Sequence, residues 1–168
     1  MSHAYVPRTA NLLGALALTL ADELQAAAAA VAGHGASGPA ALVLLGDLAG
    51  GGTIEELRKA LGLTHSGTVR LVDRLVAGGL VERRVGGDAR SVSLHLSPSG
   101  RRTARRVLAA RETVLERALI ALEPRQRVEF ERMLEAMLAE LGAPRESVCR
   151  LCDSGVCGRC PVRVTPST

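Results

Sequence analysis

Apolar residues recur every three or four positions over most of the chain, which predicts a protein built mainly of helices. The first helix is expected over residues 9–32, where leucines repeat at every fourth position from Leu12 to Leu24 and continue past two acidic residues. An amphipathic stripe of this kind is typical of a helix in a folded protein and not of a secretory signal peptide. Glycines and Pro39 follow before the apolar stretch reaches a spanning length, so we expect no membrane segment.

Residues 53–78 carry the pattern of two short helices joined by a tight turn. Thr53 and Glu56 form a capping box, in which each side chain accepts a hydrogen bond from the backbone N–H of the other residue. The helix that follows ends at Gly62, and Thr64 is the expected N-cap of the next helix. The apolar positions of this second helix leave polar and basic side chains on its outer face. Two such helices predict a helix-turn-helix.

The pattern changes to a period of two after this second helix. Residues 80–85 and 92–96 are expected to form two strands, and the sequence Gly-Gly-Asp-Ala-Arg over 86–90 lies between them. Glycines at the tip supply the positive φ that a tight hairpin needs. A hairpin directly after a recognition helix is a wing. The predicted fold class is therefore mainly α with a small β-hairpin wing, a winged helix-turn-helix on a helical dimerisation domain.

Two amphipathic helices follow the hairpin. Ser97 before Pro98 marks the start of the first helix, and Glu123-Pro124 begins the second, which ends at Gly142. The second helix carries one continuous apolar stripe, formed by Phe130, Met133, Leu134, Met137, Leu138 and Leu141. This stripe and the leucines of the first helix are too apolar to remain in water, so we expect them to form a subunit interface.

Composition and charge change this picture in two ways. Hydrophobic residues make up 47% of the chain and aromatic residues only 1%, so the core must be built of leucine, valine and alanine. The net charge is +4, but residues 53–111 alone hold twelve basic residues against five acidic ones, a net charge of +7. Such an uneven distribution favours a polyanionic partner, because phosphate contacts release counterions. A solvated basic face is the alternative interpretation.

The segment LGLTHSGTVRLVDRLVAGGLVERRVGGDARSVSLHLSPSG, residues 61–100, resembles the MarR family of winged-helix transcriptional regulators. Three features carry the resemblance: the Leu-Thr-x-Ser start of the second helix, the Leu-Val-Asp-Arg-Leu run that leads to Gly-Leu-Val, and the Asp-x-Arg wing before a Ser-x-x-Gly helix start. The resemblance extends over residues 9–141. It implies a homodimer, built by the N-terminal helix and the two C-terminal helices, that binds a pseudo-palindromic double-stranded DNA operator.

The resemblance also implies roles for individual residues. The recognition helix enters the major groove, and Arg90 of the wing, held by Asp88, reaches into the minor groove. Ser66, Thr68 and Arg70 face base edges and phosphates, and His65 is expected to be a polar residue near the DNA and not a metal ligand. The full set of expected DNA-binding residues is Thr64, His65, Ser66, Thr68, Arg70, Arg74, Arg84, Asp88 and Arg90. Arg83 is expected either near phosphates or as a solvated charge at the strand edge.

Four segments follow from these patterns. They are an N-terminal dimerisation helix over 1–36, a winged helix-turn-helix lobe over 37–100, C-terminal dimerisation helices over 101–143, and a cysteine-rich tail over 144–168. We expect a cytoplasmic regulator, a repressor, and not an enzyme, because the motifs of common hydrolases, metalloproteases and phosphate-binding loops are missing. A thiol–disulfide redox protein is the alternative, although the alternation of strands and helices that such proteins use is not seen.

A small-molecule effector is compatible with the resemblance, but the sequence does not identify one. MarR-like proteins often bind phenolic or anionic compounds between their two lobes. Tyr5 and Phe130 are the only aromatic residues of this chain, so few rings are available to stack on such a ligand. We therefore expect a weak or absent response to simple aromatic acids.

All the cysteines lie in one stretch, Cys149, Cys152, Cys157 and Cys160, with the spacing C-x2-C-x4-C-x2-C. Two C-x2-C pairs can bring four thiolates to one centre. Zinc is slightly favoured as its occupant, an iron–sulfur cluster is the second reading, and a reversible dithiol switch is the third. The resemblance assigns no role to this tail. We expect one centre against the end of the dimer, which either modulates DNA binding or only stabilises the C-terminus.

Overall fold

The computed structural model describes residues 7–33, 35, 37–48, 50–85, 92–142, 148–157 and 161–162. Over these ranges the chain forms α1 (Pro7–Ala32), α2 (Gly38–Asp47), α3 (Ile54–Leu61), α4 (His65–Ala77), β1 (Val81–Val85), β2 (Val92–Leu96), α5 (Pro98–Leu119), α6 (Pro124–Leu141) and α8 (Ser154–Cys157). The two strands pair antiparallel, with Val81 opposite Leu96 and Val85 opposite Val92. The predicted fold class, mainly α with a small hairpin, is confirmed.

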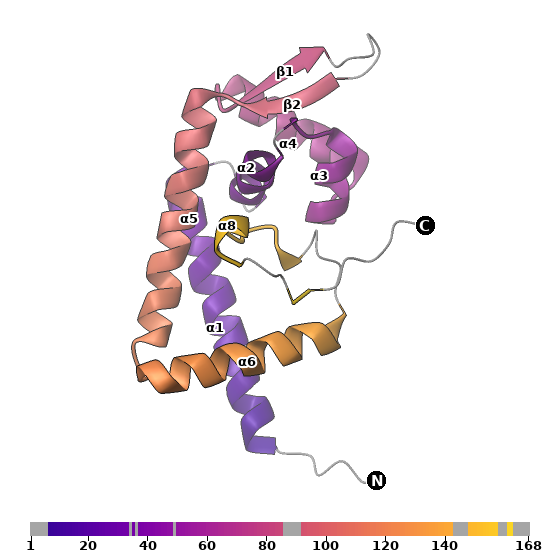
Figure 1. The fold of residues 1–168 in the computed structure, drawn as a ribbon. Helices are drawn as coiled ribbons and strands as arrows, with labels where there is room; N and C mark the ends of the chain where they lie inside the picture. Colours follow the sequence, from indigo (N-terminus) through magenta and orange to yellow (C-terminus); the bar gives the residue numbers. More distant parts are fainter. Residues whose placement is uncertain are drawn as a thin grey trace.

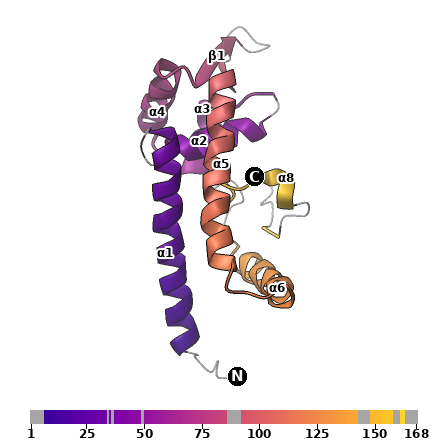
Figure 2. The same ribbon diagram turned by 90° about the vertical axis from the view of Figure 1, so that its left-hand side faces the viewer.

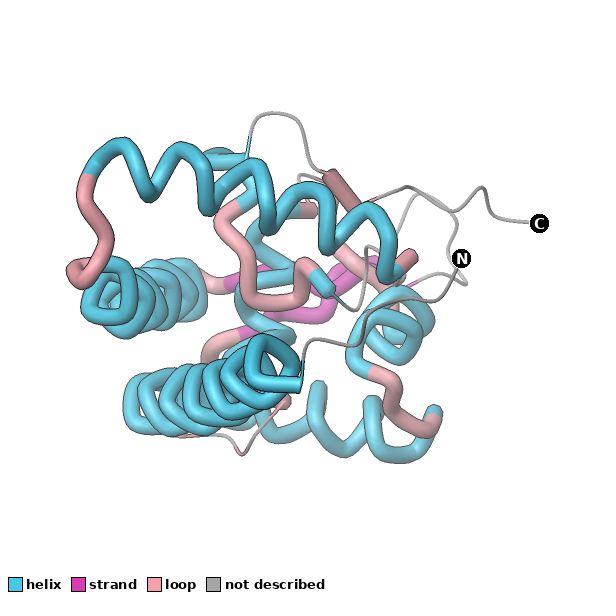
Figure 3. The backbone as a smooth tube through the Cα atoms, turned by 90° about the horizontal axis from the view of Figure 1, so that it is seen from below, coloured by secondary structure: helices cyan, strands magenta, loops and turns pink. Residues whose placement is uncertain are grey.

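Helices α1 and α5 lie side by side and run along most of the length of the molecule (Figure 1 and Figure 2). Helices α2, α3 and α4 gather with the hairpin at one end of α5, and α6 crosses near the other end (Figure 1). Seen from below, α6 crosses on one side of the molecule and is joined to α5 by a short loop (Figure 3). The winged helix-turn-helix and the long helices therefore form two distinguishable parts that share α5.

Helix α1 is long and apolar enough to cross a membrane if length and composition alone are considered. Its packing instead favours a helix that is part of the folded protein. Ala28 and Ala32 belong to the hydrophobic core, α1 packs along α5, and Glu23 forms an ion pair with Arg117 of α5. The expectation of an amphipathic helix in a folded protein agrees with these contacts.

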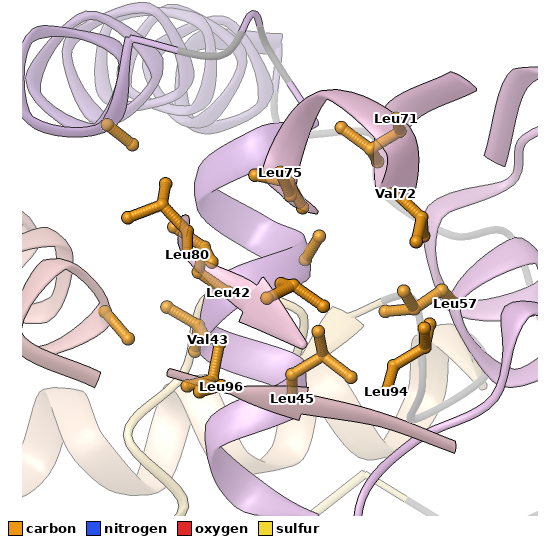
Figure 4. Packing of buried hydrophobic residues seen from close by; sticks show 14 of the residues in the cluster. Leu42, Val43, Leu45, Leu57, Leu71, Val72, Leu75, Leu80, Leu94 and Leu96 are labelled. Carbon is orange, nitrogen blue, oxygen red and sulfur yellow. The ribbon is translucent and has the colours of Figure 1, made fainter. Parts of the chain in front are cut away.

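Most of the core lies inside the winged helix-turn-helix lobe, and α1 and α5 also contribute residues to it; the core consists of aliphatic side chains (Figure 4). Leu42 of α2, Leu57 of α3, Leu75 of α4 and Leu94 of β2 are fully buried. Complete burial of each such side chain contributes roughly 1.5–3 kcal/mol relative to exposure. The buried hydrophobic cluster contains no aromatic residue in the part of the chain that the structure describes, as the composition predicted.

The predicted helix starts are confirmed by their capping hydrogen bonds. The Glu56 amide donates to Thr53 Oγ1 at 3.1 Å, and the Thr53 amide donates to Glu56 Oε2 at 2.7 Å. At the start of α4 the Gly67 amide donates to Thr64 Oγ1 at 3.1 Å. Each of these side chains satisfies a backbone N–H that has no partner within its own helix.

A bridge at Gly52 was not predicted. The Gly52 amide donates to the Leu94 carbonyl at 2.9 Å, and the Leu94 amide donates back at 2.7 Å, so a third extended segment pairs with β2. A Cβ atom on Gly52 would lie 2.7 Å from Leu45 Cδ2, so a larger residue would have to displace that side chain, which favours glycine at this position. In the sequence, the glycines at 50–52 do not indicate which segment pairs with them.

The turn after α4 packs closely against the start of α5. Ser97 caps α5 by accepting a hydrogen bond from the Gly100 amide at 2.9 Å, and its hydroxyl donates to the Gly79 carbonyl at 2.6 Å. A Cβ atom on Gly100 would lie 2.0 Å from the Leu80 carbonyl oxygen. The backbone of α5 therefore touches the backbone that leads into β1.

Gly100→Ala should lower the free energy of unfolding by roughly 1–3 kcal/mol, because the added methyl group would clash with the Leu80 backbone and force it to move. Gly46→Ala is the matched control, since its Cβ would lie 3.6 Å from Leu96 Cδ1, an ordinary contact. Chemical denaturation of both variants measures the difference. Equal free energies of unfolding for the two variants would contradict the close packing of α5 against the Leu80 backbone.

Candidate nucleic-acid interface

Helix α4 has one buried face and one exposed face. Leu71, Val72 and Leu75 are at most 1% exposed and belong to the core. Their spacing of three and four residues places them on one side of the helix. Ser66, Arg70 and Arg74 are exposed, and their spacing of four residues places them in one row along the other side. The core contacts of α4 thus fix which of its residues face outward.

Thr68 does not lie where we expected it. Its side chain is fully buried, and its hydroxyl donates to the Thr64 carbonyl at 3.0 Å. Residue 68 precedes Leu71 and Val72 by three and four positions, so it shares their face. In this structure Thr68 supports the inner side of α4 and cannot present its side chain to DNA.

The other predicted residues of α4 lie near its exposed start. Thr64 is exposed but its hydroxyl is engaged as the N-cap, and it lies 3.4 Å from the Ser66 hydroxyl. His65 and Ser66 are exposed in the first turn. The first turn therefore offers one imidazole and one hydroxyl to a ligand outside the molecule.

Several basic residues next to α4 are already paired with carboxylates. Arg58 donates to both oxygens of Glu55, at 2.7 and 2.8 Å, and this hydrogen bonding lowers the pKa of Glu55 and raises the pKa of Arg58. Arg83 of β1 forms an ion pair with Asp73 of α4 at 2.6 Å. Arg83 thus connects the hairpin to the recognition helix and is not simply a solvated charge at the strand edge.

Arg84 also lies on β1, exposed, and forms an ion pair with Glu82 of the same strand at 2.9 Å. Arg70 and Arg74, in contrast, have no ion-pair partner among the residues that the structure describes. These two guanidinium groups are therefore the cations of α4 that remain available to an anionic ligand.

Asp88 and Arg90, the predicted wing residues, lie outside the described residues. The hairpin that carries them is described on both sides, up to Val85 and from Val92. Its strands are held by the ladder and by the Ser93 hydroxyl of β2, which donates to the Arg84 carbonyl of β1 at 3.4 Å. The predicted roles of Asp88 and Arg90 stay predictions.

The cysteines lie apart from α4, in the part of the chain that follows α6. Residues 148–157, here called the cysteine segment, lie beside α5 and the end of α2 (Figure 1). Cys149 and Cys152 are half-buried, Cys157 is exposed, and Cys160 lies outside the described residues. Within the described ranges no three His, Cys, Asp or Glu residues are arranged to hold a metal ion. The single four-cysteine centre stays a prediction.

Comparison with known proteins agrees with the fold and the sequence pattern. Residues 38–91, from α2 into the hairpin, match the sequence model described as the MarR family. No curated protein matches the chain. A MarR family protein from Bacillus stearothermophilus is 28% identical with a TM-score of 0.66, and the match covers 83% of this chain and 100% of that one.

Two further solved structures show the same similarity. The Mycobacterium tuberculosis MarR family protein RV2887 is 26% identical with a TM-score of 0.61, covering 82% of this chain and 98% of that one. CouR from Rhodococcus jostii RHA1, solved bound to p-coumaroyl-CoA, is 23% identical with a TM-score of 0.61, covering 81% and 95%. The predicted resemblance is confirmed: the chain has a winged-helix fold similar to those of solved MarR family proteins, and residues 38–91 match the MarR family model, whereas the cysteine-rich tail lies outside that match.

Proposed function

We propose that the protein is a sequence-specific DNA-binding transcriptional regulator that acts as a homodimer. The observation that carries the proposal is the outward row of Ser66, Arg70 and Arg74 on α4. Its two arginines have no carboxylate partner in the described part of the chain, whereas Arg58 and Arg83 nearby are paired. Unpaired guanidinium groups on a helix that fits the major groove are suited to phosphates and to guanine.

The outward position of this row gives each residue a role. Ser66 lies in the first turn of α4, where a recognition helix meets base edges, and its hydroxyl can donate or accept. Arg70 lies one turn further and Arg74 two turns further, within reach of the phosphates along the groove. We propose repression as the outcome, because a dimer on its operator blocks other proteins from the same DNA.

The homodimer is proposed from apolar surface that the single chain leaves uncovered. None of the residues of α6 is buried, although the helix carries a continuous apolar stripe. Met137 and Leu141 of α6 and Leu12 and Leu16 of α1 are among the large exposed apolar side chains. Large contiguous apolar patches rarely remain exposed on monomeric proteins. A second copy related by two-fold symmetry would cover both helices and place two recognition helices about one turn of DNA apart.

A binding protein fits these observations better than an enzyme. The thiol–disulfide alternative requires a strand and helix framework around its cysteine pair, and the cysteines here follow the winged-helix domain. We propose a cytoplasmic location, where the operator DNA of a regulator of this kind lies.

We also propose that the four cysteines form one centre whose state modulates DNA binding. The support is their spacing, together with the position of the cysteine segment beside α5 and α2. Zinc, an iron–sulfur cluster and a dithiol pair remain the three candidates. A structural zinc site would contribute on the order of 10 kcal/mol of folding free energy to the loop that holds it.

Arg74→Ala should weaken binding to a DNA duplex selected by the wild-type protein from a random pool. Loss of one phosphate contact lowers the slope of log K against log salt by about 0.9, hence by about 1.8 for both subunits of a dimer. Fluorescence anisotropy across a salt series measures this. Arg132→Ala, at an exposed position on α6 far from the lobe, is the control and should leave the slope unchanged. An unchanged slope for Arg74→Ala would remove this contact from the proposal.

The wild-type protein should sediment as a dimer at micromolar concentration. Met137→Glu should raise the dimer dissociation constant by about 100-fold, because it places a charge in an apolar interface. Met137→Leu keeps the side chain apolar and should remain dimeric. Sedimentation velocity distinguishes the two variants, and a wild-type monomer at this concentration would contradict the homodimer.

Elemental analysis with a visible spectrum of protein purified without air identifies the centre. One zinc per chain without colour indicates a zinc site, and a brown protein with iron and sulfide indicates a cluster. Four thiols that titrate freely without metal and can be oxidised in pairs would contradict the metal readings and leave the dithiol switch. Operator affinity measured with the centre filled and emptied shows whether its state matters for DNA binding.

A further inference from the structure

The cysteine segment lies across the joint between the winged-helix lobe and the long helices. On one side Leu151 is half-buried and packs against the hydrophobic core. Val148, Leu151 and Cys152 line a cavity of about 250 Å³ together with Ala21 and Leu24 of α1. The segment therefore contacts the helix that we assign to the dimer interface.

On the other side the same segment faces α5. Cys152 lines a second cavity, of about 330 Å³, with Leu108 and Ala109 of α5. Val156 borders the same cavity but is 81% exposed, so it buries little surface there. Cys152 lines both cavities, so its half-buried side chain lies at the centre of the contact with α1 and α5. A chemical change at this thiol acts directly on the packing between the segment and the two long helices.

The segment also contacts the DNA-binding lobe. The Ser154 hydroxyl donates to Asp47 Oδ1 at 3.0 Å. Asp47 is the last residue of α2, and five residues later Gly52 pairs with Leu94 of the hairpin. The hydrogen bond therefore holds the chain just before it joins the sheet that carries the wing.

We propose that the cysteine segment is an intramolecular strap that couples the winged-helix lobe to the dimerisation helices. Docked, the strap holds the end of α2 against α1 and α5, and so sets the orientation of α4 relative to the dimer axis. A metal ion bound at Cys152 would fix the position of its sulfur atom. A disulfide between Cys152 and Cys149, formed when a peroxide oxidises the two thiols and is reduced to two waters, would do the same. Because Leu151 is the neighbour of Cys152 in the chain, docking changes with either event. This inference deepens the proposed function and rests on it.

The docked strap has little buried surface. None of its described residues, 148–157, is fully buried; Leu151 and Cys152 are half-buried, and the Ser154–Asp47 hydrogen bond joins exposed residues. Segments with few buried contacts open at low free energy, so modest chemistry can shift their equilibrium. A strap of this kind can change between a docked and an undocked state, whereas a segment that is as fully buried as the leucines of α4 cannot.

Two variants release the strap, and a third is their control. Leu151→Ser removes the apolar anchor, and Asp47→Ala removes the hydrogen-bond acceptor on α2. Val156→Ser makes a similar change in the same segment at a side chain that is 81% exposed. Circular dichroism and thermal melting of each variant confirm that the winged-helix domain is folded.

Docking is measured without DNA. The full-length protein is reduced, stripped of metal and treated with iodoacetamide, and the rate of labelling at Cys152 is followed by peptide mass mapping. Leu151→Ser should label Cys152 about tenfold faster than wild type, because the anchor loses the burial of one apolar side chain. Asp47→Ala should show a smaller increase, and Val156→Ser should match wild type.

Coupling is measured with the duplex selected by the wild-type protein, at fixed salt. Leu151→Ser should change operator affinity by about fivefold or more, a typical size for coupled sites, while Val156→Ser should not. Unchanged labelling of Cys152 in Leu151→Ser would overturn docking. Faster labelling with unchanged affinity would overturn the coupling.

The two proposals fail in different ways. A wild-type protein that selects no duplex overturns the proposed function, and the coupling with it, whereas the labelling rates still decide whether the segment docks. Normal DNA binding together with labelling that no variant alters overturns the strap alone.

Discussion

The orientation of α4 depends on the burial of its aliphatic face. Leu71, Val72 and Leu75 are at most 1% exposed and belong to the hydrophobic core, to which the described residues contribute no aromatic ring. Rotating α4 by one residue would expose these side chains and turn Arg70 or Arg74 toward the core. Burying an unpaired guanidinium group costs several kcal/mol, far more than any local preference of the helix. The outward direction of the proposed DNA-binding row follows from this packing.

Helix α5 connects the lobe that holds α4 to the rest of the molecule. At its start, Ser97 and Gly100 hold it against the backbone of Gly79 and Leu80, where the hairpin begins. Along its middle it packs on α1 and α2 and faces the cysteine segment. Because the junction at the start of α5 is backbone against backbone, a change of position along α5 is carried into the hairpin and is not absorbed by side chains.

Features set by nearby residues could be predicted from the sequence. The helix starts at Thr53, Thr64 and Ser97 depend on caps within three residues, and the hairpin depends on a change of period next to a glycine pair. Thr68 was assigned to the wrong face because a threonine fits either side of a helix; its spacing from Leu71 and Val72 was the available signal.

Features set by distant residues could not be predicted in the same way. Gly52 pairs with Leu94, and Ser154 meets Asp47, across many residues of chain, and nothing in the local sequence specifies either partner. The glycine run at 50–52 signals only that backbones can approach closely there. The position of the cysteine segment could not be predicted for the same reason: nothing in residues 148–157 specifies that the half-buried Leu151 packs against the hydrophobic core.

The weak docking of the cysteine segment determines which chemistry can move it. Its apolar anchor is one half-buried leucine, whose complete burial would contribute roughly 1.5–3 kcal/mol. A disulfide typically contributes about 2–4 kcal/mol to the conformation that it closes, and structural zinc contributes on the order of 10 kcal/mol. Either event is therefore large enough to compete with docking at this site. Helix α4 has stronger anchors, because Leu71, Val72 and Leu75 are at most 1% exposed and Thr68 is buried on the same face. A change in the docking of the segment would therefore alter the position of the lobe before it disturbs the packing of α4.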